Sequence, residues 1–458
     1  MSKDSLIPNS KIFFFSGPVV KGKFASSFLQ LFSILGLASV TIFFVANAYI
    51  QKALTSHSEN MPVQSELELA QASQGYVLQA STIQTANPNA SEDSKRLLNW
   101  ISNLPNRTDT RVISGQHAGS SSFERQYQTH IVDLSVRTGK YVGLMGLDLA
   151  WMDRNHATDW PEALPIIIDY WNQKGLISIS WEAPNPAGSG IVNMAQLTTP
   201  GNATYNRWMT ELEDTARKLA ELQTAGVVVL WRPLLEMNLS RSSHWWCQAS
   251  QQDFVNVWRH MFDFFTKDKE LNNLLWVYSP ATSSSSTTYY YPGGQYVDIV
   301  GQTFYIQNNP LSGIGNRGYN ALTALGKPYA LSEFGPGTGS TPPAIKTFNY
   351  QTLINGIKEY CPKTTYFMSW YEERAIYNQN NASGLLNDSW IITREEVDWK
   401  PTENVIFYDI NNDSRLDILD LTYFLQNWGT PTPSRLDFNN DKIINSADYK
   451  ILVNTLSL

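Results

Sequence analysis

The sequence contains little cysteine and little histidine, and both shortages exclude kinds of site. The two cysteines, Cys247 and Cys361, show neither a zinc spacing nor a disulfide framework, and they form either one bond or two free thiols. The six histidines are too scarce for a metal cage among the candidate residues, and no Ser-His-Asp pattern lies in a nucleophile elbow. The formal charge of −7 is modest, which argues against nucleic acid and anionic membrane surfaces as main partners.

The N-terminal residues 1–48 have the pattern of a signal peptide or membrane anchor. Basic residues precede an apolar run over 28–45, and Ala46-Asn47-Ala48 follows as a small-x-small cleavage site. The run is long for a cleaved signal and short for a spanning helix, so both alternatives remain open. Both predict a secreted or otherwise extracytoplasmic protein, with membrane contact only through this segment. Residues 49–92, rich in Gln, Ser, Ala and Asn, predict a flexible linker.

Residues 93–400 alternate short β-rich runs with helical stretches. The expected strands are 111–116, 141–151, 176–182, 226–236, 274–280, 297–305, 328–335 and 364–372. The expected helices between them include 123–139, 206–224, 252–267 and 348–360. Eight such units predict an α/β fold, a (β/α)8 TIM barrel. An open doubly wound sheet is the alternative, but it usually brings a Gly-rich phosphate turn after the first strand, and residues 114–120 do not match that fingerprint.

Two glutamates stand at the ends of expected strands, where barrel enzymes place their chemistry. Glu236 ends the fourth β-rich run, and Glu333 lies near the end of the seventh. Glycoside hydrolysis needs one carboxylic acid to protonate the leaving oxygen and a second carboxylate to meet the oxocarbenium-like centre. The pair therefore predicts a glycosidase with Glu236 and Glu333 as catalytic residues.

Aromatic and polar residues gather at the same strand ends. Tryptophan is abundant, with 15 residues, and flat side chains suit stacking on sugar rings as well as core packing. We therefore expect a polysaccharide substrate to be bound by His117, Asp148, Trp151, Trp181, Glu182, Arg232, Asn238, Trp245, Trp246, Tyr305 and Trp370.

Residues 95–400 resemble glycoside hydrolase family 26, whose (β/α)8 members are retaining enzymes best known as β-mannanases. The resemblance rests on an Arg-Pro…Glu-Met-Asn segment at 232–238 with its Trp pair, and on Leu-Ser-Glu-Phe-Gly at 331–335. It implies that Glu236 is the acid/base and Glu333 the nucleophile. It also implies that Tyr305 contacts the nucleophile and that Trp370 forms the floor under the sugar.

Two residues depart from the family pattern. Leu235 stands where the family usually has a histidine before the acid, and Glu182 replaces a histidine on the third strand. We expect a changed glycone subsite, in which Glu182 accepts hydrogen bonds from a sugar hydroxyl. The resemblance implies a retaining endo-glycosidase acting on β-1,4-mannan-type polysaccharide. Another β-glycanase, such as a β-glucanase or xylanase, or a non-catalytic polysaccharide-binding barrel, is the alternative.

Residues 401–458 contain two twelve-residue loops with oxygen donors at the spacing that calcium requires. The expected Ca²⁺ ligands of the first loop are Asp409, Asn411, Asp413, Arg415, Asp417 and Asp420. Those of the second are Asp437, Asn439, Asp441, Ile443, Asn445 and Asp448. Arg415 and Ile443 would contribute backbone carbonyls. The ion is expected to be structural, and none is expected in catalysis.

This pair of loops resembles a type I dockerin, a small all-α domain of paired EF-hand-like motifs that docks onto cohesin domains. A cohesin-type scaffold protein is therefore a possible partner, and a calcium-stabilised domain without a partner is the alternative. The glycine usual at position 6 is Ser414 in the first loop and Lys442 in the second. Both residues are expected to adopt a backbone conformation that favours glycine.

Overall fold

The computed structural model describes residues 83–456 except for short gaps. These gaps are 107–111, 120–121, 151–158, 284–285, 307–310, 339–340, 401–407, 412–419, 422, 425–426, 428–435 and 440–441. The predicted targeting segment and the predicted linker up to residue 82 lie outside the described residues. In the described part, no helix combines the length and the apolar character that crossing a membrane requires.

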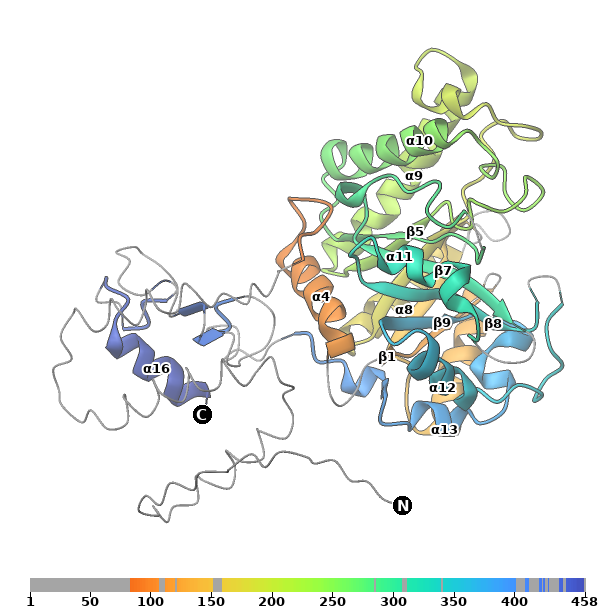
Figure 1. Cartoon of the computed structure of the whole chain (residues 1–458). Helices are drawn as coiled ribbons and strands as arrows, with labels where there is room; N and C mark the ends of the chain where they lie inside the picture. The colour runs from red at the N-terminus through yellow and green to blue at the C-terminus, as the bar shows by residue number, and fades with distance from the viewer. Residues whose placement is uncertain are drawn as a thin grey trace, which may run out of the picture.

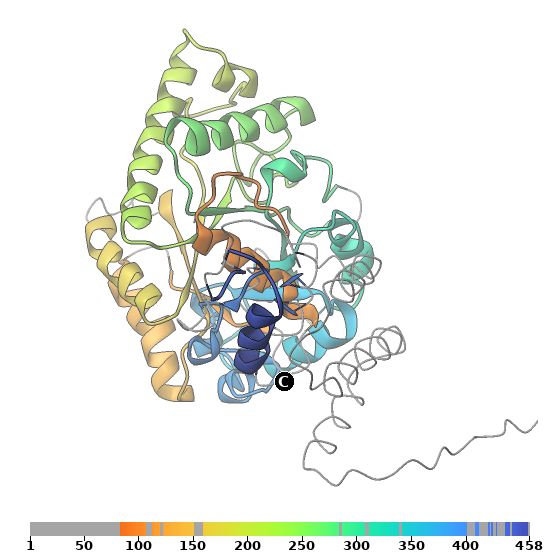
Figure 2. The ribbon, with the colours of Figure 1, turned by 90° about the vertical axis from the view of Figure 1, so that its left-hand side faces the viewer.

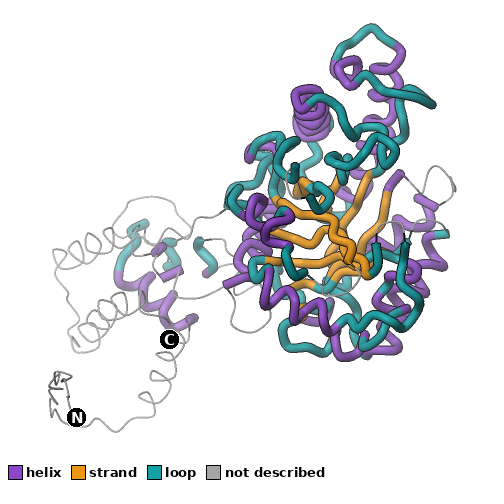
Figure 3. The backbone as a smooth tube through the Cα atoms, turned by 45° about the vertical axis from the view of Figure 1, so that its right-hand side comes forward, coloured by secondary structure: helices purple, strands orange, loops and turns teal. Residues whose placement is uncertain are grey.

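Eight parallel strands close into a barrel, as the sequence predicted. They are β2 (Gly115–His117), β3 (Leu144–Asp148), β4 (Leu176–Trp181), β5 (Val229–Pro233), β6 (Leu274–Tyr278), β7 (Ile299–Ile306), β8 (Tyr329–Pro336) and β9 (Thr364–Ser369). Each pairs with its neighbour along the chain, and β9 pairs with both β8 and β2, so the sheet has no open edge within this ring. The strands lie at the centre of the molecule with helices around them (Figure 3). The closure excludes the doubly wound alternative.

The first predicted strand is divided into two short ones. β1 (Val112–Ile113) pairs with β9 and with β10 (Ile391–Ile392), whereas β2 pairs with β9 and β3. Between them, the backbone N–H and the hydroxyl of Ser114 both donate to the Ile392 carbonyl, which interrupts the strand. Gly115 then passes so close to β9 that an added Cβ would lie 2.3 Å from the Phe367 carbonyl oxygen. Only glycine fits there.

Helices cover the outside of the barrel (Figures 1 and 2). They are α4 (Glu92–Asn103), α5 (Phe123–Tyr127), α6 (Asp133–Thr138), α8 (Asp159–Asn172), α9 (Ala203–Thr224), α10 (Gln251–Asp263), α11 (Tyr319–Thr323), α12 (Gln351–Tyr360) and α13 (Ala382–Leu386). One π-helical turn, η2 (Gln128–Val132), joins α5 to α6, and another, η4 (Phe264–Asp268), extends α10. Short 3-10 turns are η1 (Leu104–Asn106), η3 (Met194–Thr198), η5 (Gly294–Tyr296), η6 (Ile314–Arg317), η7 (Glu372–Arg374), η8 (Ile376–Asn378) and η9 (Arg394–Glu396).

The long helices begin at capping side chains and bury one apolar stripe. The side chains of Ser91, Asn202 and Ser250 accept backbone N–H bonds at the starts of α4, α9 and α10, which satisfies donors that a helix leaves unpaired. On α9 the predicted stripe is buried, and it comprises Trp208, Leu212, Ala216, Leu219 and Leu222. The helix is thereby fixed against the barrel.

The barrel domain begins earlier than the predicted boundary at residue 93. Ala86, Asn87 and Ala90 are buried, and the Ala86 N–H donates to the Asp298 carboxylate over 2.6 Å. The last ten residues of the predicted linker therefore belong to the barrel. The composition of 49–92 did not reveal this, because the contacts are made by backbone and small side chains.

A second, separate core lies in the C-terminal region. It consists of Ile410, Leu421, Phe424, Leu436, Ile444 and Leu452, with Tyr408, Phe438 and Tyr449 packed against them. Its one long described helix is α16 (Ser446–Leu456), which follows the second predicted calcium loop. The buried residues of this core are separate from those of the barrel core.

Candidate active site

Glu333, on β8, is held at both carboxylate oxygens. Arg232 Nη2 donates to Oε2 over 2.7 Å from β5, and the Tyr305 hydroxyl donates to Oε1 over 2.5 Å from β7. The ion-paired side chains of Glu333 and Arg232 are only 5% and 3% exposed. Charge-assisted bonds of this kind are short and strong, and two of them leave the carboxylate little freedom to rotate.

The groups around Glu333 have opposing effects on its pKa. Burial raises the pKa of Glu333 above its ordinary value, Arg232 lowers it, and the charge of Glu236 raises it. Arginine remains protonated at physiological pH, so the 2.7 Å contact favours the carboxylate form of Glu333 at neutrality. Burial, and then the Glu333 carboxylate, raise the pKa of Tyr305 well above its ordinary value, so the phenol keeps its proton and remains a donor.

Glu236 stands in the turn after β5 and is more open. Its side chain is 14% exposed. Leu234 and Glu236 both have a left-handed backbone, with φ of 46° and 55°, which is unfavourable for residues other than glycine. The Glu236 N–H donates to the Ser279 carbonyl over 2.8 Å, and its carbonyl accepts a bond from the Cys247 thiol. Strained conformations of this kind persist only where neighbouring contacts hold them.

Asn238 and Asp148, predicted to bind substrate, are occupied by protein contacts. The Asn238 amide exchanges two hydrogen bonds with the backbone of Ala281, over 2.9 and 2.8 Å. Asp148 is buried and accepts bonds from Ala150 N, Ser180 Oγ and Glu182 N. Both residues fix the loops at the mouth of the barrel, and a contact of either one with sugar stays a prediction. Asp148 in particular holds the backbone of Glu182, whose side chain is partly exposed at the end of β4.

Trp181 and Trp246 are also core residues. Trp181 packs between Trp208 of α9 and Trp231, because successive strand side chains point to opposite faces and this one points outward. Trp246 is buried under the ring of His244, and its indole N–H donates to the Leu235 carbonyl over 2.8 Å. The contacts of these two tryptophans shown here are structural, and their predicted sugar contacts stay a prediction.

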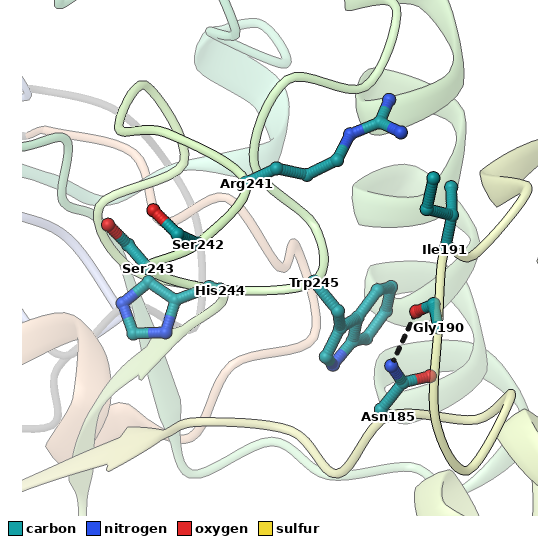
Figure 4. Close-up of a pocket in the computed structure, with 8 residues that line it drawn as sticks. All are labelled: Asn185, Gly190, Ile191, Arg241, Ser242, Ser243, His244 and Trp245. Atoms are coloured by element: carbon teal, nitrogen blue, oxygen red, sulfur yellow. Dashed lines mark hydrogen bonds between the residues drawn. The ribbon is translucent and has the colours of Figure 1, made fainter.

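Trp245 differs from its neighbour, because it reaches a surface pocket. The pocket has a volume of about 440 Å³ and is lined by Asn185, Gly190, Ile191, Arg241, Ser242, Ser243, His244 and Trp245 (Figure 4). Trp245 is anchored by an indole N–H bond to the Ala183 carbonyl over 2.8 Å. Ile191 is 75% exposed at the opposite wall. His244 joins this pocket to the Glu236 carboxyl, since its Nε2 lies 3.5 Å from Glu236 Oε2.

His117 and Trp370 lie together at the ends of β2 and β9. Their ring centres are 4.5 Å apart, and Trp370 is partly exposed. Burial, then the charge of Arg232 and that of His130, lower the pKa of His117 well below its ordinary value, so the ring is neutral. Its Nδ1 accepts the Gly119 N–H, which leaves the proton on Nε2, and no partner for Nε2 occurs among the described residues. Trp151 lies outside the described residues.

Sequence reasoning missed two residues near the carboxylates. His244 follows Glu236 at a spacing that belongs to no known motif. Its position directly before Trp245 was the sequence signal that could have indicated it. Arg374 lies with its guanidinium 4.9 Å from the Tyr305 ring centre and donates to the Thr338 carbonyl over 2.6 Å. It supports the tyrosine that holds Glu333.

The sequence left open whether the two cysteines form a disulfide, and it argued against a histidine metal cage. Cys247 and Cys361 are both buried and free, so the disulfide alternative is wrong. Burial raises the pKa of each thiol to about 12, which makes both unreactive. Across the residues that the structure describes, no three His, Cys, Asp or Glu side chains are arranged to hold a metal ion.

The two predicted calcium loops share one hydrogen-bonding pattern in their described residues. The position-12 carboxylate Asp420 accepts bonds from the backbone of Ile410 and Asn411, over 2.9 and 3.4 Å. Asp448 does the same with Phe438 and Asn439, over 2.7 and 3.1 Å. Both carboxylates are fully buried.

At position 6 of the second loop, Lys442 has φ of 73°, as expected for a site that favours glycine. Four of the predicted ligands and the position-6 residue of the first loop lie outside the described residues, and they are Asp413, Arg415, Asp417, Asp441 and Ser414. The predicted backbone strain is thus confirmed for Lys442 only.

The barrel matches a known family over most of its length. The model for glycosyl hydrolase family 26 matches residues 86–396. This chain belongs to glycoside hydrolase family 26. The predicted family and the predicted glycosidase class are therefore confirmed. The match ends before the two predicted calcium loops begin.

Related proteins are identical to this chain at about a third of the aligned residues. The chain is 34% identical to the mannan endo-1,4-β-mannosidase A and B of Caldalkalibacillus mannanilyticus, over 72% of this chain and 66% of that protein. It is 33% identical to the mannan endo-1,4-β-mannosidase of Bacillus subtilis, over 72% of this chain and 93% of that one. The solved structure of a B. subtilis mannanase superimposes with a TM-score of 0.60 at 32% identity, covering 68% of this chain and 96% of its own. The barrel of this chain is therefore the family 26 glycoside hydrolase domain.

Proposed function

We propose that this family 26 hydrolase is an endo-acting β-mannanase that cleaves β-1,4-mannan by double displacement with retention. The observation that carries the proposal is the Glu333 carboxylate, which Arg232 and Tyr305 hold at both oxygens and whose pKa the charge of Glu236 raises. The names of the relatives at about a third identity support mannan as substrate.

Glu333 suits the nucleophile because it is immobilised and kept ionised by Arg232. Its carboxylate oxygen bonds to the anomeric carbon as the glycosidic C–O bond breaks, and Glu236 gives its proton to the leaving oxygen. Glu236 then takes a proton from water, the water oxygen attacks the anomeric carbon, and Glu333 is released. Glu236 is the more exposed of the two, as a residue that exchanges protons with water must be.

Glu182 is proposed to set the glycone subsite. Asp148 holds its backbone at the end of β4 over 3.0 Å, so the side chain extends from a fixed point at the mouth. A carboxylate there would accept hydrogen bonds from sugar hydroxyls. Replacing Glu182 by His should alter the preference among polymers. An unchanged preference would remove Glu182 from the subsite.

The deciding experiment is reducing-sugar release by the full chain on galactomannan, glucomannan, mixed-linkage glucan and xylan, with Glu333→Ala in parallel. Release from the two mannans, lost in the variant, supports the proposal. Release only from the glucan or xylan would reassign the substrate to the other β-glycanases. No release, with polymer still retarding the protein in an affinity gel, would favour a non-catalytic binding barrel. Retention is checked by following the anomeric configuration of the first product by NMR.

For the C-terminal domain we propose a dockerin-like calcium module. The matching contacts of Asp420 and Asp448 and the left-handed Lys442 support two loops of one kind. Buried carboxylates without a cation are costly, and a hard divalent ion at the loop oxygens would relieve that cost. Calorimetric titration of calcium into the full chain should give two sites. A cohesin-type scaffold is the proposed partner, tested by pull-down with cohesin domains in calcium and in EDTA.

Extracytoplasmic localisation follows as a further proposal, supported by the basic-apolar-small pattern of residues 1–48. N-terminal sequencing of the protein from culture medium should begin at Tyr49. Recovery only in the membrane fraction with an intact N-terminus would favour the anchor.

A further inference from the structure

A histidine reaches the Glu236 carboxyl from the loop that follows β5. His244 Nε2 lies 3.5 Å from Glu236 Oε2, which is within ion-pair distance, and the two side chains are 13% and 14% exposed. Hydrogen bonds in an empty active site are often long and shorten when substrate binds. The distance therefore fits a contact that tightens on the reaction path.

The position of the His244 ring is fixed by the indole of Trp246. The two rings lie 4.4 Å apart and are parallel to within 2°. The same indole donates its N–H to the Leu235 carbonyl over 2.8 Å, immediately before Glu236. One buried tryptophan thus sets both the backbone that carries the acid and the imidazole that faces it.

The left-handed turn makes this support necessary. Leu234 and Glu236 both occupy a backbone region that disfavours side chains. The Cys247 thiol contacts the Glu236 carbonyl, so the segment 244–247 touches the turn at three points. Without such contacts the carboxyl would sample other directions, and a displacement of about 1 Å at a reacting group costs about 100-fold in rate.

We propose that His244 is a positioning residue for Glu236, an inference that rests on the proposed function. Its Nε2 orients the carboxyl toward the leaving oxygen and stabilises the carboxylate that forms when the proton departs. Leu235, immediately before Glu236, has no polar side-chain group, and the imidazole that faces the carboxyl comes from a later point in the same loop. His244 also lines the pocket of Trp245 and Arg241, so the contact lies at the edge of a cavity next to the acid (Figure 4).

The test compares two substrates that differ in their need for an acid. Mannan has a poor leaving group, whereas 2,4-dinitrophenyl β-mannobioside releases a phenolate that needs no proton. For His244→Ala we expect kcat/KM on mannan to fall about 10- to 100-fold, mainly through kcat, because the acid is misplaced. On the aryl glycoside, kcat/KM should stay within about threefold of the wild type. His244→Gln, which keeps an N–H donor, should recover part of the loss on mannan.

Two controls separate a positioning role from a general loss of structure. Ser240→Ala changes the same loop at an exposed hydroxyl that lies beside the Ser242 and Ser243 hydroxyls and does not line the pocket, and it should match the wild type on both substrates. In a Glu236→Ala background, His244→Ala should add no further loss on mannan, since residues acting through one group are not additive. Equal losses on both substrates, or no loss on mannan, would overturn the inference while the proposed function stands. A wild-type protein inert on both would instead refute the proposed function, and the inference with it.

Discussion

Glu333 and Glu236 have the same side chain, but different kinds of structure hold them. Glu333 stands within β8, and its partners Arg232 and Tyr305 extend from two other strands of the barrel. Glu236 stands beyond the end of β5 in a left-handed turn, and its neighbours come from a loop. The first is fixed by the sheet, and the second depends on residues that follow it in sequence.

The difference matches the tasks proposed for the two groups. A nucleophile must remain charged and aimed at one carbon, which a closed barrel with an arginine and a tyrosine supplies. An acid/base must accept and release a proton, which requires some access to water. The loop provides that access and needs its own supports, which are Trp246 and His244.

The largest effect is expected where the strands hold the carboxylate. Glu333→Ala removes the nucleophile, and the loss of kcat on mannan should be about 10⁴-fold or more, as for other covalent catalysts. Reducing-sugar release measures the loss. With azide as an external nucleophile, turnover should return in part and give a glycosyl azide of inverted anomeric configuration, which has no reducing end and is detected by NMR. A variant with more than a tenth of wild-type activity would show that Glu333 is not the nucleophile.

A smaller effect is expected when one donor to that carboxylate is removed. Tyr305→Phe deletes the 2.5 Å bond to Glu333 and should lower kcat about 100-fold. That bond lowers the pKa of Glu333, against the burial that raises it, so its loss should raise the pKa further. The acid limb of the pH–rate profile should therefore move to higher pH, because more of the carboxyl is protonated at a given pH.

The control for this shift of the acid limb is Arg232, which still donates to the other oxygen of Glu333, Oε2. Arg232 remains in Tyr305→Phe, so the limb should move without loss of folding, which circular dichroism checks. A limb that stays in place, or moves to lower pH, would contradict the assigned donor.

On the loop side the expected effect is smaller again. Trp246→Phe keeps a ring under His244 but removes the N–H bond to Leu235, worth about 1 kcal/mol, and kcat on mannan should fall about tenfold. Trp245→Phe is the matched control, since it deletes the bond to Ala183 next to the pocket, and it should affect KM more than kcat. If Trp246→Phe lowered kcat on mannan as much as Tyr305→Phe, the proposed difference between the strand-held and the loop-held carboxyl would be contradicted.

The strand-held half of the site could be predicted from sequence because it follows periodicity. Eight apolar runs predicted eight parallel strands, and parallel strands bring their ends to one rim, so Arg232, Tyr305 and Glu333 were expected together. The face of the strand on which each side chain lies was harder to predict. Trp181 was expected at the mouth and points instead toward α9, a difference of one position along the strand.

The loop-held half could not be predicted in the same way. Loops have no period, and the side chains of Asn238 and Trp246, which were expected to meet sugar, bind backbone groups of the protein. His244 was missed because its relation to Glu236 arises from a left-handed turn and a stacked indole. Those are tertiary contacts, and no spacing in the sequence encodes them.

The smallest effect on catalysis should come from removing metal, which contrasts the barrel with the C-terminal domain. The proposed calcium ligands lie beyond the family match, and the described barrel residues contain no cluster suited to a metal ion. EDTA should therefore leave mannan hydrolysis within about twofold of its value in calcium.

Calcium at a hundred times its Kd should stabilise the C-terminal domain by about 2.7 kcal/mol, seen as a shifted thermal transition by calorimetry. Asp420→Ala with Asp448→Ala should abolish that shift and leave activity intact, because both carboxylates lie beyond the residues that match the hydrolase family. A loss of hydrolysis in EDTA that calcium restores would place a metal in the barrel's chemistry and overturn the separation of the two domains.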